Sequence, residues 1–259
     1  MKSIAVVNQK GGIGKTTVAT HLGYAGRDAG LRVLMVDLDR QGSSSLTFSP
    51  VDGAAPGLLA SGLFAERLPD LQPEIVSAGL SIIRADKGLS LLTGADAAQL
   101  KRPRQHLKSL AANYDLCVID TPGSIDLSPP MTAGALVAAE AVICPFPVGL
   151  YESAALKDLL EFLTKIKQEG YNPALRVMGL LPSKINTKSK SEREALEGLR
   201  AQLGKLILPA MLAERNAVKQ SVLRRKPVWL GTRGAGHKVA AEEWKTAMNM
   251  ILTDLGVMQ

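Results

Sequence analysis

Aromatic residues, cysteines and long apolar runs are scarce in this chain, and each scarcity excludes a class of protein. Phe, Trp and Tyr make up 4% of the 259 residues, so the core must be aliphatic. The two cysteines, Cys117 and Cys144, lie within apolar runs, so we expect buried strand thiols and neither a disulfide framework nor a cysteine metal site. No apolar run reaches the roughly 18 residues of a membrane-spanning helix, and strand-like sequence begins by Ser3 without a signal peptide. We therefore expect a cytoplasmic protein.

Charge is unevenly distributed along the chain. The formal net charge is +7, but residues 171–238 hold fourteen Lys and Arg against four Asp and Glu, so this basic third has a net charge of +10. A basic segment beside a mildly acidic remainder indicates a surface for a polyanion. We favour nucleic acid; the alternative is a solvated basic face, because the charges are not interleaved with aromatic residues.

Short apolar runs alternate with segments that are long enough for helices. The strand-like runs are Ile4–Val7, Val33–Val36, Leu80–Ile83, Leu116–Ile119, Val142–Cys144 and Val177–Leu181. The helical segments are Lys15–Ala29, Ser90–Asn113, Tyr151–Glu169 and Ser189–Leu203, and Gly42–Gly62 is expected to be a loop running into a short helix. This alternation predicts an α/β fold, with a mostly parallel sheet and helices on both faces. No linker rich in Pro or Ser divides the chain, so we expect residues 1–259 to form a single domain.

A glycine-rich segment follows the first strand and leads into a helix, which is the context of a phosphate-binding loop. Its residues are Gln9, Lys10, Gly11, Gly12, Ile13, Gly14, Lys15, Thr16 and Thr17. The loop amides and the helix N-terminus form an anion site, because the first helical N–H groups have no intrahelical partner. Lys15 would reach the outer phosphates, and the Thr16 hydroxyl would hold Mg²⁺. Gln9 stands where the generic pattern has glycine, and a second lysine, Lys10, stands at the mouth of the loop.

Aspartates follow two other predicted strands. Asp37 and Asp39 end the second strand, and such a carboxylate pair costs desolvation unless a cation or a bound water uses it. The alternative role for Asp37 is a turn or helix cap. Asp120 ends the run Leu116–Ile119, as in a Walker-B strand, and would hold Mg²⁺ through a water molecule.

These three motifs resemble those of the ParA/MinD family of ATPases in residues, order and spacing. The resemblance rests on the deviant Walker-A loop K-G-G-x-G-K-T-T, on D-x-D-x-Q-G from Asp37 and on D-T-P from Asp120. It spans nearly the whole chain and is nearest the short ParA type, because no helix-turn-helix segment precedes residue 3. The family commonly has proline where this chain has Arg40 and Gly123.

The resemblance implies cofactors, partners and roles for the motif residues. ATP and Mg²⁺ would be bound, Asp39 would orient the attacking water, and Asp37 would lie near the metal. Lys10 would cross to the phosphates of a second subunit, so that ATP is buried in a face-to-face homodimer that hydrolysis dissolves. The dimer would bind non-specific duplex DNA on the nucleoid, and a centromere-binding, ParB-like partner would stimulate a slow ATPase that segregates DNA. The alternative is a ParA-like ATPase that positions a protein cargo.

Basic residues of the C-terminal third are the candidate DNA contacts, because phosphate contacts give affinity without sequence reading. They are Lys184, Lys188, Arg215, Lys219, Arg224, Arg225 and Lys226, with Lys190, Arg193, Arg233 and Lys238. Pro182, Ser183, Lys184 and Asn186, after the apolar run Val177–Leu181, occupy the region where this fold class reads the nucleotide base, with Pro182 and Asn186 as the expected contacts. A second basic cluster is interpreted as a solvated helix face: Lys101, Arg102, Arg104 and Lys108.

Three other classes of ATPase fit the sequence less well. A membrane-bound regulator of the MinD type needs a basic amphipathic tail, and residues 255–259 contain no Lys or Arg. An iron–sulfur reductase holds its cluster through cysteines in flexible loops, whereas Cys117 and Cys144 lie in predicted strands. A metabolic ligase needs a substrate pocket with its own polar residues, and the sequence shows no such set.

Overall fold

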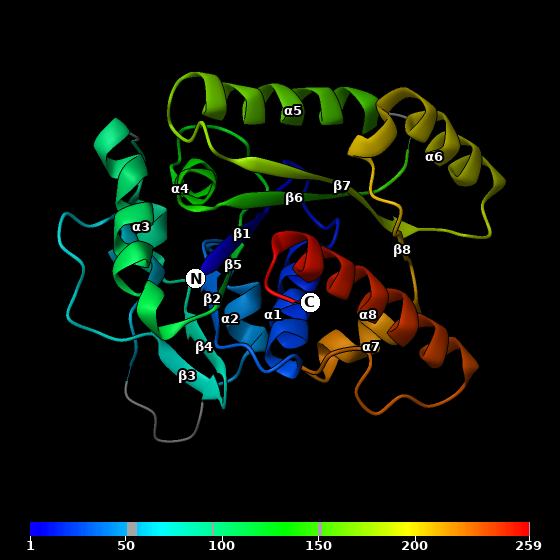
Figure 1. The fold of residues 1–259 in the computed structure, drawn as a ribbon, viewed down its shortest axis with the longest axis horizontal. Helices are drawn as coiled ribbons and strands as arrows, with labels where there is room; N and C mark the ends of the chain where they lie inside the picture. Colours follow the sequence, from blue (N-terminus) through cyan, green and yellow to red (C-terminus); the bar gives the residue numbers. More distant parts are fainter. Residues whose placement is uncertain (51–55, 95, 150–151, 259) are drawn as a thin grey trace.

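The architecture is an eight-stranded sheet with helices on both faces, as the sequence predicts (Figure 1). A computed structural model describes residues 1–50, 56–94, 96–149 and 152–258. The strands are β1 (Lys2–Val6), β2 (Val33–Asp37), β3 (Glu74–Ser77), β4 (Leu80–Ile83), β5 (Leu116–Asp120), β6 (Ala141–Phe146), β7 (Arg176–Ile185) and β8 (Leu212–Ala213). Their order in the sheet is β3-β4-β2-β5-β1-β6-β7-β8, and every pair is parallel except β3 with β4.

Helices and short 3₁₀ turns connect the strands. The α-helices are α1 (Lys15–Asp28), α2 (Ser43–Thr47), α3 (Ala97–Ser109), α4 (Met131–Ala138), α5 (Glu152–Gln168), α6 (Lys190–Leu203), α7 (Asn216–Leu223) and α8 (Ala235–Leu255). The 3₁₀ turns are η1 (Ala60–Phe64), η2 (Lys87–Leu91), η3 (Ala111–Asn113) and η4 (Gly204–Leu206). No helix in the described part of the chain is both long and apolar enough to cross a membrane.

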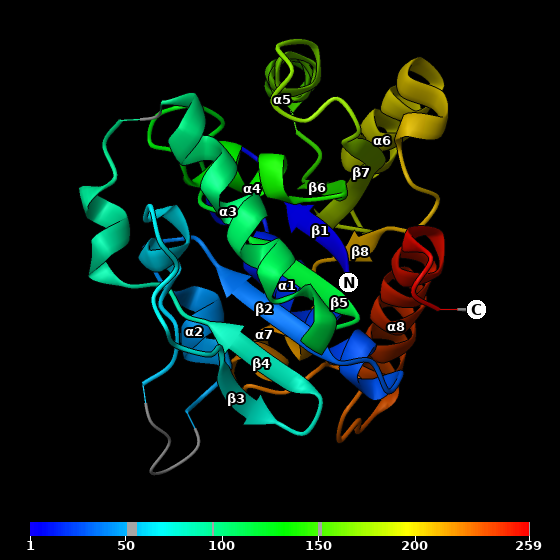
Figure 2. The same cartoon turned by 60° about the vertical axis from the view of Figure 1, so that its left-hand side comes forward.

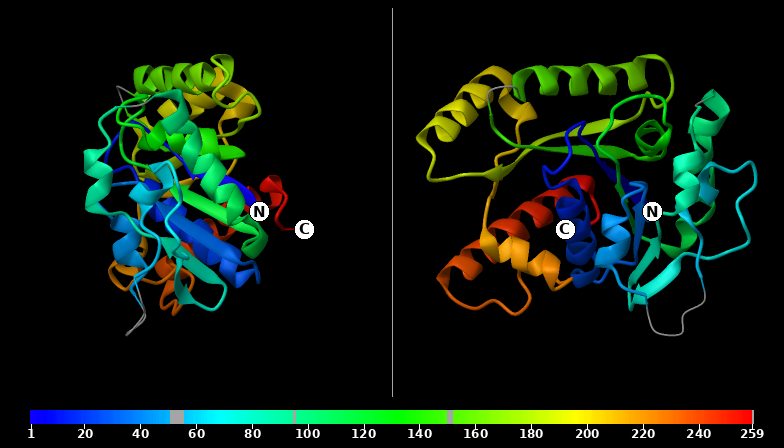
Figure 3. Two further views of the ribbon diagram at one scale, coloured as in Figure 1. Left: turned by 90° about the vertical axis from the view of Figure 1, so that its left-hand side faces the viewer. Right: turned by 180° about the vertical axis from the view of Figure 1, so that it is seen from behind.

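Two aliphatic cores hold the helices on the sheet, one on each face. Alternate residues of the central strands point to opposite faces, so that Ala5 belongs to one core and its neighbour Ile4 to the other. Helices α3, α4, α5 and α6 cover the first face, and α1 and α8 cover the second. Figure 2 shows this division of the helices, and Figure 3 shows it from the side and from behind. Both cysteines are buried in β5 and β6, as predicted, and burial raises the pKa of each thiol to about 12.

Two of the predicted segments differ from the structure. The helix expected over Ser90–Asn113 is confined to α3, because Asp96 caps it by accepting a hydrogen bond from the Gln99 amide at 2.5 Å. The stretch after Gly42 begins with helix α2 and not with a loop, because Gly42 takes the left-handed conformation just before it, with φ of 65°. Residues 51–55 of that stretch lie outside the described chain.

Helix α1 meets α8 around a buried histidine. His21 is packed edge-on or tilted against Tyr24, Trp229 and Trp244. Its Nε2 accepts from the Val228 amide at 3.2 Å, so its Nδ1 carries the proton donated to the Thr17 carbonyl at 2.8 Å. His21 is therefore held neutral, and its complete burial lowers the pKa to about 4.

We expect acid to weaken the protein through His21. The unfolded histidine titrates near pH 6.5 and the folded one near pH 4, so the unfolded chain binds the extra proton between these values. The contribution of His21 to the free energy of unfolding should fall by about 3 kcal/mol from pH 6.5 to pH 4, since one pKa unit corresponds to about 1.4 kcal/mol. Urea denaturation of the wild type and of His21→Gln across this range checks it. The difference in the free energy of unfolding between the two proteins should shrink as the pH falls. A difference that stays constant over this range would contradict the prediction.

Candidate nucleotide site

The sheet brings the sequence motifs together at one edge. Val6 at the end of β1 and Asp37 at the end of β2 both lie beside Asp120 at the end of β5. The glycine-rich segment leaves β1 at this point, so it lies over the carboxyl ends of three adjacent parallel strands. Open α/β sheets bind their ligands in this place.

The loop between β1 and α1 has the backbone of a phosphate cradle. Gly12 and Gly14 adopt positive φ angles of 73° and 100°, which favour glycine. Asn8 Oδ1 accepts a hydrogen bond from the Lys10 amide at 2.9 Å, which fixes the start of the loop. Helix α1 begins at Lys15 directly after Gly14, so its first amides face outward as an anion site.

The side chain of Lys15 is buried against this loop. Its side chain is 7% exposed, and its Nζ donates to the Lys10 carbonyl at 2.9 Å. Burial lowers the pKa of the ammonium, while the carboxylates of Asp120 and Asp39 act in the opposite sense. Lys15 is therefore a cation at the base of the loop. A phosphate oxygen can replace the Lys10 carbonyl as the acceptor of its hydrogen bond.

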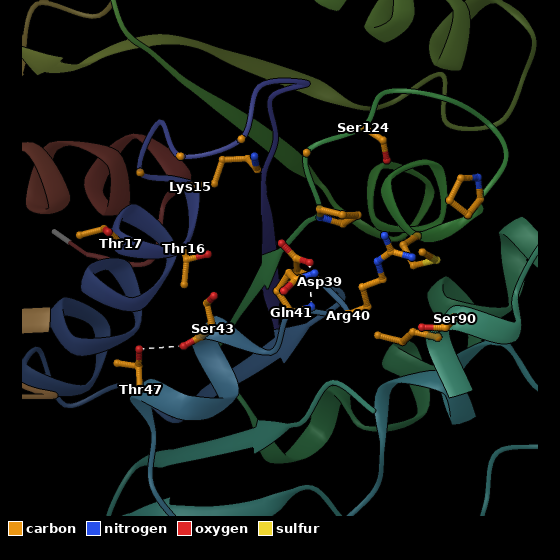
Figure 4. A pocket seen from close by; sticks show the side chains of 18 of the residues that line it. Lys15, Thr16, Thr17, Asp39, Arg40, Gln41, Ser43, Thr47, Ser90 and Ser124 are labelled. Carbon is orange, nitrogen blue, oxygen red and sulfur yellow. Dashed lines mark hydrogen bonds between the residues drawn. The ribbon is translucent and has the colours of Figure 1, made fainter. Parts of the chain in front are cut away.

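A large cavity of about 980 Å³ opens over the loop. The predicted residues that line it are Gly11, Gly12, Gly14, Lys15, Thr16, Thr17 and Asp39. Figure 4 shows Lys15 and Thr16 on one side of the cavity and Asp39 on the other. Ile13 instead turns into the protein, where it is 3% exposed. The cavity therefore places a cation, a hydroxyl and a carboxylate around one space.

Asp120 lies beneath this cavity and is completely buried. Its Oδ2 accepts from the Ser44 hydroxyl at 2.8 Å, and the Thr16 hydroxyl lies near enough to help stabilise the charged carboxylate. Its Oδ1 is buried and receives no hydrogen bond from the described residues. Burial is the largest cause that raises the pKa of Asp120, and repulsion from the Asp37 carboxylate adds to the shift. A buried carboxylate with an unsatisfied oxygen beside a threonine hydroxyl fits a hard cation such as Mg²⁺.

Asp37 is also completely buried, but its contacts are those of a cap. Its Oδ2 accepts from both the amide and the hydroxyl of Ser45, each at 2.7 Å, and its Oδ1 accepts from the Asp39 amide at 3.2 Å. Burial raises the pKa of Asp37, although the Ser45 bonds oppose the shift. Asp37 therefore fixes the start of α2 and the backbone of Asp39, and its place near a metal stays a prediction.

The two positions that depart from the family's prolines both line the cavity. Arg40 points away from Lys15, into the space between Ser90 and Ser124 (Figure 4). Gly123 lies close to the phosphate loop, because a Cβ at this position would be 3.3 Å from the Gly11 amide nitrogen. A side chain there would press on the loop.

Of the region predicted to read the base, Pro182 and Asn186 line neither of the cavities at the loop, whereas Ser183 and Lys184 line the smaller one. Pro182 is buried in β7 opposite Phe146, and Asn186 is exposed, its Oδ1 accepting from the Lys188 amide at 3.1 Å. A smaller cavity of about 50 Å³ adjoins the loop instead. Its lining comes from α1, from the end of β7 and from the segment after β8, and includes Gly14, Thr17, Ser183, Lys184, Glu214 and Val218.

The candidate DNA contacts divide into paired and exposed side chains. Arg215 pairs with Glu243 at 2.8 Å and Lys219 pairs with Glu214 at 2.7 Å, while Lys184 bonds the phosphate loop. The residues Arg224, Arg225, Lys226 and Lys188 are exposed, as are Lys184 and Lys219, and Arg225 also donates a hydrogen bond to the Ser49 hydroxyl. In the second basic cluster, Lys101, Arg104 and Lys108 are exposed as predicted.

Arg102 of the second cluster corrects the interpretation of a solvated face. Its side chain is 22% exposed, and its Nη1 donates to the Phe64 carbonyl at 3.0 Å. The arginine therefore ties α3 to η1.

Sequence reasoning missed the residues that support the two buried aspartates. Ser44 and Ser45 stand in an unremarkable Ser/Gly-rich stretch, with no pattern to mark them. Ser45 is held in turn by β4, since its hydroxyl accepts from the Ala85 amide at 2.9 Å and its carbonyl accepts from Arg84 at 2.5 Å. Gly42, the N-cap residue of α2, is the one signal in the sequence for where this helix begins.

Comparison with solved structures supports the fold. McdA of Cyanothece in complex with ATP aligns with a TM-score of 0.81 at 21% identity, over 100% of this chain and 98% of that one. A putative plasmid partition protein of Borrelia burgdorferi bound to AMPPNP gives 0.77 at 20% identity, over 96% and 98%. Cobyrinic acid a,c-diamide synthase of Mycobacterium smegmatis with ADP and magnesium gives 0.75 at 23% identity, over 97% and 94%.

Sequence comparison shows the family. A family model described as an AAA domain matches residues 1–177. Protein IncC of Escherichia coli is 29% identical over all of this chain and 71% of its own length. The chromosome partitioning protein ParA of Caulobacter vibrioides is 28% identical over 89% of this chain and 87% of its own length. The chromosome-partitioning ATPase Soj of Thermus thermophilus is 28% identical over 94% and 95%. With the phosphate loop and Asp39 around one cavity and the buried Asp120 beside Lys15, the chain belongs to the ParA/MinD family of partition ATPases.

Proposed function

We propose that this chain is an ATP-dependent DNA segregation ATPase, acting as a single domain over residues 1–259. The observation that carries the proposal is the placement of buried Lys15, on a phosphate loop, opposite Asp39 in one cavity and close to the buried carboxylate of Asp120. The relatives named IncC, ParA and Soj support a role in partition.

The triphosphate of ATP would lie on the loop amides, with Lys15 at its outer phosphates. Mg²⁺ would be held by the Thr16 hydroxyl and, through water, by Asp120, and it would neutralise charge on the phosphates. The base would enter the smaller cavity beside Gly14 and Thr17, which lies on the α1 side of the loop. Side chains around that cavity would have to move to admit a purine.

Hydrolysis requires positioning and charge neutralisation more than covalent chemistry. Asp39 faces the cavity and its Oδ1 accepts from the Gln41 amide at 3.0 Å, so the carboxylate is held but retains acceptor positions for a water. The carboxylate of Asp39 would align that water for in-line attack on the γ-phosphate. Lys15 and the loop amides would stabilise the charge that develops.

Dimerisation would couple this site to DNA. Lys10 is exposed at the mouth of the loop, where it could reach the phosphates of a second copy. An ATP-bound homodimer would carry two basic clusters and bind non-specific duplex DNA on the nucleoid. A ParB-like, centromere-binding partner would speed a slow hydrolysis and release the dimer.

Binding of duplex DNA tests this function. With ATP, the wild type should bind DNA of any sequence, and log affinity should fall with log salt by about 0.9 for each phosphate neutralised. Joint replacement of Arg224, Arg225 and Lys226 by alanine should lower affinity equally on unrelated sequences and flatten the salt slope. Fluorescence anisotropy over a salt series measures both quantities, and ATPase activity without DNA should be retained.

The matched control removes the same charge elsewhere. Joint replacement of Lys101, Arg104 and Lys108 by alanine takes three exposed cations from α3 and should leave DNA affinity near the wild-type value. If both triple variants weaken binding equally, net charge and not the Arg224–Lys226 cluster carries the interaction. Wild-type protein that binds no DNA with ATP would contradict the nucleoid-binding function and favour positioning of a protein cargo.

A further inference from the structure

Lys184 has a backbone conformation that its sequence context does not predict. It lies near the end of β7, between the buried residues Ser183 and Ile185. The pairing of β7 with β8 shifts register between Ser183 and Ile185, so Lys184 is the extra residue of a bulge. Its φ is 56°, in the left-handed region that is unfavourable for a residue with a Cβ. Bulges and strained residues of this kind re-aim side chains at functional sites.

The bulge aims Lys184 at the phosphate loop. Its Nζ donates a hydrogen bond to the Gly12 carbonyl, and its Cε lies 3.9 Å from the position that a Cβ on Gly14 would take. Lys184 also lines both the large cavity over the loop and the smaller cavity beside Thr17. Lys184 therefore borders both cavities while its ammonium bonds the loop between β1 and α1.

Lys15 bonds the same loop in the same way as Lys184. The Nζ of Lys15 donates to the Lys10 carbonyl and that of Lys184 to the Gly12 carbonyl, so two ammonium groups bond two carbonyls of the same loop. An ammonium has three N–H donors, and a single carbonyl bond leaves donors for a second acceptor. The carboxylate of Glu214 lies near enough to Lys184 for the two charges to attract each other. The Glu214 side chain nevertheless forms its hydrogen bond with Lys219, at 2.7 Å.

We propose that Lys184 is a nucleotide-binding residue, a cation of the site additional to Lys10 and Lys15, and not a DNA contact. It holds the outer side of the phosphate loop through Gly12 and donates to the nucleotide between the phosphates and the base. The inference rests on the proposed function, since it assigns a residue to the same nucleotide site. It also explains why a lysine occupies a backbone position that favours glycine or asparagine.

Nucleotide affinity without DNA tests the assignment. Lys184→Met keeps the length of the side chain and removes the ammonium, so the Kd for ATP and for ADP should rise roughly tenfold or more, the value of a charge-assisted hydrogen bond. Lys184→Arg should recover most of that loss. In steady-state assays of Lys184→Met, KM for ATP should rise while kcat at saturating ATP stays within about twofold of wild type, as expected for loss of uniform binding. Calorimetry and a phosphate-release assay give these values.

Two further variants separate charge from backbone strain. Lys205→Met removes an exposed lysine of η4 and should bind nucleotide as the wild type does. Lys184→Gly relieves the left-handed strain, so it should bind nucleotide as weakly as Lys184→Met while its melting temperature is maintained or raised.

The outcomes distinguish this assignment from the proposed function. If the wild type binds ATP and Lys184→Met binds it equally well, the assignment is wrong while the ATPase function stands. A selective loss of DNA affinity in Lys184→Met at saturating ATP would return the residue to the DNA surface. A wild type that does not bind ATP would instead overturn the proposed function itself.

Discussion

Replacement of Lys15 by alanine is expected to abolish ATP binding at micromolar concentrations. The lysine is 7% exposed and its Nζ already bonds a loop carbonyl at 2.9 Å, so its ammonium is fixed where the phosphates would lie. Hydrogen bonds to charged groups contribute about 1.5–3 kcal/mol each, so loss of two such bonds corresponds to a roughly hundredfold or greater weakening. Isothermal calorimetry with ATP and Mg²⁺ measures the change.

The melting temperature of Lys15→Ala shows whether the substitution removes only ATP binding or also disturbs the fold. Burial disfavours the charged form of Lys15, as the lowered pKa shows, so removing the ammonium should not weaken the folded protein. Lys15→Ala should therefore melt at or above the wild-type temperature without nucleotide, and Lys205→Ala should bind ATP normally. Equal ATP affinity in Lys15→Ala and wild type would refute the interpretation of residues 9–17 as a phosphate loop.

The central strands could be predicted because they are buried on both faces. Runs such as Val33–Val36 and Leu116–Ile119 are continuously apolar, and both become strands within one residue of the predicted ends. The edge strands escaped prediction for the converse reason. In β3, Ile75 is 67% exposed and its neighbours are half-buried, while β8 is two residues long, so neither carries a strong apolar signal.

The sequence predicts a site residue correctly where one motif identifies both the residue and the strand that precedes it. Lys15, Asp39 and Asp120 each follow a predicted strand, and parallel pairing alone brings them to one edge. Ser44 was missed because its contact with Asp120 joins residues 76 positions apart and depends on where α2 begins. The sequence places Lys184 both among the DNA contacts, by its charge, and in the region that reads the base, by its position after a strand. The bulge that turns its side chain toward Gly12 is not visible in the sequence.

Replacement of Asp39 by alanine is expected to stop hydrolysis while ATP is still bound. The carboxylate faces the cavity from the end of β2, opposite the loop that would hold the phosphates (Figure 4). Positioned acid–base groups contribute about 10²–10⁴-fold to rate, so turnover should fall roughly a hundredfold or more. ATP affinity should change little, because the phosphate contacts of Lys15 and the loop remain. Trapped as the ATP complex, Asp39→Ala should stay dimeric in sedimentation experiments, whereas the wild type returns to monomer as ATP is consumed.

Asp39→Asn separates the carboxylate from the shape of the loop. Asparagine retains an oxygen for the Gln41 amide, which Asp39 Oδ1 accepts at 3.0 Å, so the turn that precedes α2 should be preserved. It removes the negative charge that, in the proposed mechanism, orients the attacking water. Asp39→Asn should therefore be as inactive as Asp39→Ala, with an unchanged melting temperature. If the asparagine variant hydrolyses ATP at the wild-type rate, Asp39 acts only by holding the turn, and another group must align the attacking water.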